Sequence, residues 1–253
     1  MNTNDVKKIR VDILEMVHAA KEGHIPSAFS ITELLYAIYS NMDRVNDTFF
    51  LSKGHASAGL YAVLAHFGIL DKVELVNYCK YDSKLGGHPH RHVNGVMVST
   101  GSLGHGFPMA AGYALGKKIR KESGRVFCIV GDGETNEGTI WEAAMYAEQL
   151  KLSNLVCIID ENRSQTRAMT SINLKEKFKA FGWDTKEVDG HNLDEIEGAL
   201  FEPGTVGAMA PLCVVARTVK GKGVKAMEND FFSWHHKAPN AEELEAFKQE
   251  ILK

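Results

Sequence analysis

Two continuous apolar segments flank a helical pattern, and this arrangement constrains the fold more than any other feature of the sequence. The segments are Arg125–Val130 and Leu155–Ile159, with an amphipathic helix predicted over Thr139–Leu150. Apolar strands without polar alternation are typical of a parallel sheet covered on both faces, because both sets of side chains are then buried. The alternation continues with the predicted strand Trp183–Val188, helix Leu193–Leu200 and strand Leu212–Val219.

Helical patterns dominate the first 121 residues and return at the end of the chain. The predicted helices are Val6–Lys21, Ile31–Ser40, Ser57–Phe67, Leu70–Lys80, Phe107–Lys121 and Ala241–Leu252. No repeat or linker divides the chain. We therefore predict one α/β domain over residues 1–253, with a doubly wound, mostly parallel sheet, helices on both faces and a helical N-terminal layer.

Composition excludes several classes of protein. The 29 Lys and Arg residues stand against 32 Asp and Glu, a net charge of -3, so no basic field for nucleic acid is expected. The apolar segments are strand-sized, whereas a membrane span needs about 20 apolar residues, and the first residues lack a secretory signal pattern. The four cysteines form no CxxC pair. A reducing cytoplasm and no membrane association are expected.

The ends of the two central strands carry oxygen ligands. Asp132 follows the first strand and Asn162 follows the second, and ligands of open parallel sheets collect at the carboxyl ends of the strands. A carboxylate and an amide oxygen suit Mg²⁺, which completes its shell with water and phosphate oxygens. A turn or helix cap is the commoner role of an Asp between glycines. A calcium loop fits less well, because its glycine would fall one place late, at Gly138.

Several segments then resemble one known family, in order along nearly the whole chain. Residues 131–138 read GDGETNEG, and with Asn154–Asn162 they resemble the thiamine diphosphate signature. Within that superfamily the chain is most similar to transketolase. Further similar segments are Gly23-His24, Leu51-Ser52-Lys53-Gly54-His55, Gly87-His88-Pro89, Thr100–Gly106, Lys220–Gly223 and Trp234–Pro239.

The resemblance implies the cofactors thiamine diphosphate and Mg²⁺, with Ca²⁺ or Mn²⁺ as substitutes. Asp132, Asn162 and the backbone carbonyl of Ser164 would hold the metal, and the Gly133 amide would contact the diphosphate. The other implied cofactor-binding residues are His55, Gly101, Ser102, Leu103, Glu134, Asn162, Lys220 and His236. Gly101, Ser102 and Leu103 would line the aminopyrimidine and thiazolium side, and His55 and Lys220 would lie near the diphosphate.

Eleven histidines are numerous for 253 residues, and we single out five that lie in loop-like segments: His24, His55, His88, His105 and His236. Imidazole moves protons near neutral pH, as transfer of a two-carbon ketol unit from a ketose to an aldehyde requires. The resemblance implies that His24 and His236 contact the reacting carbonyl or hydroxyls and that His88 contacts a terminal hydroxyl. A zinc site at His88, His90 and His92 is an alternative, because alternate residues of an extended strand share one face.

The chain departs from the family pattern in places. His105 stands for a common Gln, Ser102 for Pro, and Lys237 for a common Gly after His236, so His235 remains a rival for the catalytic position. We prefer His236 because it keeps its spacing to Pro239.

The family also needs a glutamate for N1′ of the cofactor, and it lies on a pyrimidine domain that is absent from residues 1–253. The expected protein is therefore the N-terminal subunit of a split transketolase, an α₂β₂ heterotetramer with a separate pyrimidine-domain partner, acting on ketose and aldose substrates. Two alternatives stay open. One is the alpha subunit of a 2-oxo acid dehydrogenase first component, and the other is a cofactor-binding scaffold without turnover.

Overall fold

A computed structural model describes residues 2–166, 169, 173–202 and 209–253. Their contacts divide the chain into two compact units. Unit 1 consists of residues 1–39, 54–101 and 219–253, and unit 2 of residues 40–53 and 102–218. The single domain expected over residues 1–253 stays a prediction.

Unit 2 contains a parallel sheet. Its strands are β1 (Thr48–Leu51), β2 (Val126–Gly131), β3 (Leu155–Glu161), β4 (Asp184–Asp189) and β5 (Leu212–Arg217). They lie in the order β1-β2-β3-β5-β4, and every neighbouring pair is parallel. All residues of β2 are buried, as are the first six of β3, so the prediction of fully covered parallel strands is confirmed. The register aligns Cys128 with Cys157 and Cys157 with Cys213, and these three thiols lie in the core.

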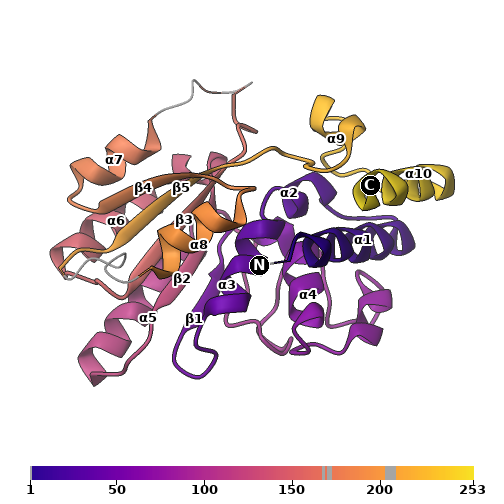
Figure 1. Ribbon diagram of the computed structural model, residues 1–253. Helices are drawn as coiled ribbons and strands as arrows, with labels where there is room; N and C mark the ends of the chain where they lie inside the picture. Colours follow the sequence, from indigo (N-terminus) through magenta and orange to yellow (C-terminus); the bar gives the residue numbers. More distant parts are fainter. Residues whose placement is uncertain (1, 167–168, 170–172, 203–208) are drawn as a thin grey trace. The chain divides into compact units, whose positions relative to one another are not determined.

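Helices pack on this sheet (Figure 1). They are α5 (Gly106–Arg120), α6 (Gly138–Gln149), α7 (Leu174–Ala180) and α8 (Leu193–Phe201). The chain crosses the sheet in one direction from β3 to β4 and in the other from β4 to β5. Right-handed crossovers then place α7 and α8 on opposite faces, so the doubly wound topology is confirmed. Strands β2 and β3, connected by α6, are neighbours in the sheet. Asp132 and Asn162 therefore both lie at the carboxyl ends of the strands.

Unit 1 is helical. Its helices are α1 (Thr3–Ala20), α2 (Ile25–Phe29), α4 (Ser57–His66), α9 (Lys225–Asn229) and α10 (Ala241–Leu252), with short 3₁₀ turns η1 (Gly54–Ala56) and η2 (Lys72–Asn77). α1 packs on both α4 and α10 and lies between them in Figure 1. Asn240 caps α10 through a reciprocal pair with Glu243, which satisfies free amides of the first turn. Helix α3 (Thr32–Asn41) begins in unit 1 and ends in unit 2.

Most predicted elements are confirmed, with small shifts at their ends. The segment predicted as a helix over Leu70–Lys80 is the 3₁₀ turn η2 instead. Strand β1 was not predicted, because its four residues are too few to show a period. Helices α2, α7 and α9 were also missed; each has seven residues or fewer.

Candidate functional site

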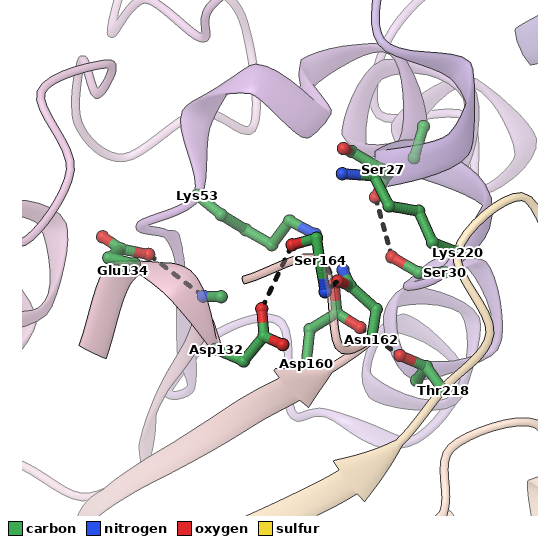
Figure 2. A network of polar contacts seen from close by, with 12 residues as sticks. Ser27, Ser30, Lys53, Asp132, Glu134, Asp160, Asn162, Ser164, Thr218 and Lys220 are labelled. Carbon is green, nitrogen blue, oxygen red and sulfur yellow. Dashed lines mark hydrogen bonds and ion pairs between the residues drawn. The ribbon is translucent and has the colours of Figure 1, made fainter. Parts of the chain in front are cut away.

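The metal set predicted from the sequence comes together in unit 2 (Figure 2). The Ser164 hydroxyl donates to Asp132 Oδ1 at 3.3 Å, and the Ser164 amide donates to Asn162 Oδ1 at 3.0 Å. The Asp132 amide donates to the Asp160 carbonyl at 3.1 Å, which joins the ends of the two strands. All three predicted ligand residues, Asp132, Asn162 and Ser164, thus belong to one hydrogen-bonded cluster.

One atom of this cluster indicates a cation. The Asp132 side chain is only 2% exposed, and its Oδ2 has no hydrogen-bond partner within the described residues. Burial, and then the Asp160 carboxylate, raise the pKa of Asp132 above its ordinary value. A buried carboxylate oxygen without a partner is costly, and a hard divalent cation would satisfy it. The residues present therefore fit Mg²⁺.

Clusters of His, Cys, Asp and Glu side chains would indicate a metal site of a different kind. No group of three or more of these side chains in the described ranges could hold a metal ion. The predicted Mg²⁺ set is of another composition, with one carboxylate, one amide oxygen and one backbone carbonyl.

Two residues that are predicted to contact the cofactor form hydrogen bonds within the chain. The Gly133 amide donates to Asp132 Oδ1 at 2.7 Å. The Glu134 carboxylate accepts from the Ser52 hydroxyl at 2.5 Å and from the amides of Gly104 and Gly131 at 2.8 and 3.1 Å. Glu134 thereby fastens the Ser102–Gly104 loop to the Gly131–Gly133 turn. Its contact with the cofactor stays a prediction, as do those of Gly133, Ser102 and Leu103.

Unit 1 gathers the predicted histidines into a second cluster. The ring of His24 lies 4.6 Å from that of His236, 5.2 Å from His235 and 5.6 Å from His55, measured between centroids. His88 lies 6.5 Å from His24. These five residues are called the histidine cluster below. His90 and His92 pair separately at 4.6 Å.

The backbone around Gly23 and around Gly87 places two members of the histidine cluster, His24 and His88. Gly23 has a φ of +150°, and a Cβ there would lie 2.7 Å from Val17, so glycine is needed for the turn that ends at His24. The Tyr61 hydroxyl donates to the His88 carbonyl at 3.2 Å, and the Ser57 hydroxyl donates to the Gly87 carbonyl at 2.9 Å. Both donors lie on α4, which therefore fixes the Gly87-His88 turn.

Lys220 and the C-terminal segment complete the cluster. The Gly221 amide donates to the Pro26 carbonyl at 3.1 Å, which holds the segment beside the turn that carries His24. Lys220 is buried, and its Nζ lies 3.2 Å from Nδ1 of His235. The carboxylate of Glu22 lies 4.0 Å from Nε2 of His236. Glu22 was not predicted from the sequence, where its place two residues before His24 was the only signal.

The cluster controls the protonation of its central member. Burial, and then the imidazoles of His236 and His235, lower the pKa of His24 to about 4. The His24 Nδ1 is buried and has no hydrogen-bond partner in the part of the chain that is described. His24 is therefore neutral near pH 7, where an imidazole can accept a proton or a hydrogen bond.

Comparison with known proteins gives the same family throughout. Residues 1–251 match the family described as transketolase, thiamine diphosphate binding domain. One of the subunits of the apulose-4-phosphate transketolase of Phocaeicola vulgatus is 36% identical, and the match covers 97% of this chain and 92% of that protein. Human transketolase is 37% identical over 96% of this chain, but only 41% of the human protein is matched.

Solved structures agree with the sequence matches. The transketolase of Campylobacter jejuni superposes with a TM-score of 0.89 at 27% identity, covering 99% of this chain and 43% of that one. The sheet order, the Asp132 cluster and the family match over residues 1–251 lead to one conclusion. This chain belongs to the transketolase family and is a thiamine diphosphate binding domain of that family.

Proposed function

We propose that this chain is the diphosphate-binding subunit of a split transketolase, which transfers a two-carbon ketol unit from a ketose to an aldehyde. The observation that carries the proposal is the buried Asp132 Oδ2, left without a partner in the described chain, in the cluster with Asn162 and Ser164. The Phocaeicola relative is itself named as one subunit of a transketolase, and 92% of it is matched, which supports a division of the enzyme between two chains.

Asp132, the Asn162 amide oxygen and the Ser164 carbonyl would hold Mg²⁺ in this proposal. His55, Lys220 and the Gly133 amide would bind the diphosphate, and Gly101, Ser102 and Leu103 would line the ring system. Gly133 suits this role because the space beside its Cα is open. A Cβ built there would have the Cβ of Gln165 as its nearest neighbour, at 3.9 Å. Bound thiamine diphosphate supplies the electron sink that allows the C2–C3 bond of a ketose to break.

The histidine cluster would perform the proton transfers. Neutral His24 would accept a proton or hydrogen bond from a substrate hydroxyl, and His236 would act beside it. His88, which lies near His24, would bind a terminal hydroxyl. His235 is paired with Lys220, and we therefore keep His236 as the catalytic member of the two neighbours.

A pyrimidine-domain subunit would complete the enzyme as an α₂β₂ heterotetramer, because N1′ of the cofactor needs a glutamate from that domain. The test uses the chain with this subunit, thiamine diphosphate and Mg²⁺, and compares ketol transfer from ketoses with decarboxylation of 2-oxo acids. We expect ketol transfer. Decarboxylation alone would assign the chain to a 2-oxo acid dehydrogenase first component, and binding without turnover would make it a scaffold.

A further inference from the structure

A second buried carboxylate lies beside the predicted metal ligands. Asp160, on β3, is fully buried, and its carboxylate accepts from Lys53 Nζ, from Thr218 Oγ1 and from Asn162 Nδ2, the last at 2.7 Å (Figure 2). Its backbone carbonyl also accepts from the Asp132 amide at 3.1 Å. One residue therefore holds both predicted metal-binding side chains, Asp132 through the backbone and Asn162 through the side chain.

The Asp160 carboxylate determines which atom Asn162 offers to a metal. An ionised carboxylate that is paired with Lys53 can only accept hydrogen bonds, so the amide nitrogen of Asn162 must face it. The amide oxygen then points away from Asp160, where it accepts from the Ser164 amide at 3.0 Å. Because Mg²⁺ binds oxygen and not an amide nitrogen, this orientation is the one that can bind the metal.

The two other donors lie where the chain passes from one unit to the other. Lys53 follows β1 and precedes His55 by two residues, and Thr218 follows β5 and precedes Lys220 by two residues. Both are the last residues of their segments of unit 2. Asp160 therefore links the strand end that precedes Asn162 to the last residues of two other segments of unit 2.

We infer that Asp160 is a positioning residue for metal binding. Asp160 orients the Asn162 amide and fixes the Asp132 backbone. Lys53 neutralises the charge of the Asp160 carboxylate. This inference rests on the proposed function, because it assumes that Asn162 binds Mg²⁺. Groups that orient metal ligands in this way typically contribute 10–100-fold to metal affinity.

The test is calorimetric titration of Mg²⁺ into the chain, assembled with its pyrimidine-domain subunit, in saturating thiamine diphosphate. The variant Asp160→Asn can donate to Asn162 and permits its amide to flip, so we expect Mg²⁺ affinity to fall roughly 10–100-fold. The matched control is Glu33→Gln, which also removes the carboxylate of a buried ion pair, with Arg10 at 2.7 Å in unit 1. We expect its Mg²⁺ affinity to equal that of the unmodified chain.

Because Asp160→Asn leaves Lys53 buried without its partner, a second variant, Lys53→Met/Asp160→Asn, removes both charges together. Unfolding and circular dichroism check that it folds. A folded double variant with reduced Mg²⁺ affinity supports the inference, because stability is then separated from metal binding. Unchanged affinity in the double variant overturns the inference alone. Failure of the unmodified assembly to bind thiamine diphosphate with Mg²⁺ overturns the proposed function, and the inference with it.

Discussion

The rings of His24 and His236 lie 4.6 Å apart in an edge-to-face arrangement, although they come from opposite ends of the chain. The turn at Gly23 presents the first ring. The second lies in a segment whose Pro239 carbonyl bonds Nδ1 of His18 on α1 at 2.7 Å. The proximity of the two histidines therefore depends on the packing of unit 1 and not on sequence spacing.

Replacing either histidine by Ala should lower ketol transfer by roughly 10²–10⁴-fold, the usual contribution of one general acid–base group. The measurement is kcat for the assembled enzyme with a panel of ketoses. The control is His66→Phe, because His66 packs on Tyr36 and Phe67 outside the histidine cluster. Full activity of His236→Ala, together with a loss in His235→Ala, would make His235 the catalytic residue.

The lowered pKa of His24 predicts how stability depends on pH. The unfolded chain binds this proton below about pH 6.5, whereas the folded chain binds it only below about pH 4. The stability contributed by His24 is therefore complete above the unfolded pKa and decreases as the pH falls through this window. Urea unfolding should show a steeper loss of stability for the unmodified chain than for His24→Gln. Equal slopes would show that His24 titrates alike in both states.

Asp132→Asn should separate stability from metal binding. The substitution removes a buried negative charge whose Oδ2 has no partner among the described residues, so the metal-free chain should unfold at an equal or higher temperature. The rise in melting temperature that Mg²⁺ and thiamine diphosphate give the unmodified chain should disappear. Thermal unfolding with and without both ligands checks this. A retained rise would remove Asp132 from the metal site.

Glu134→Gln tests whether this residue binds the cofactor or only fastens its loop. The buried Glu134 carboxylate accepts three hydrogen bonds. In Gln, the NH₂ group of the amide would replace one carboxylate oxygen and face a hydrogen-bond donor instead of accepting from it. We expect the free energy of unfolding to fall by about 1–3 kcal/mol. Denaturant unfolding measures the loss. Unchanged stability with weakened cofactor binding would instead make Glu134 a direct cofactor ligand.

The sequence predicted the sheet well because its central strands carry an unambiguous pattern. Residues 126–130 and 155–159 are apolar without interruption, and the polar residues that follow them mark the ligand edge of the sheet. Strand β1 could not be predicted, because its pairing with β2 comes from tertiary contact and not from a local period.

The supporting residues of the site were also missed from the sequence. Lys53 lies between Ser52 and Gly54 in one of the segments that resemble the family, and Thr218 follows a strand more than 160 residues later. Only the folded chain brings both to Asp160. A polar residue within an apolar strand, as Asp160 is in β3, was the one signal that could have indicated such a network.

Dependence on a second polypeptide is the most direct test of the proposed split transketolase. The measurement is the rate of ketol transfer by the purified chain with thiamine diphosphate, Mg²⁺ and ketose donors, with and without a pyrimidine-domain polypeptide. We predict no turnover by the chain alone and activity when the second polypeptide is added, because the proposal assigns the N1′ glutamate to that polypeptide. Ketol transfer by this chain alone, at a rate that the second polypeptide does not change, would contradict the proposal.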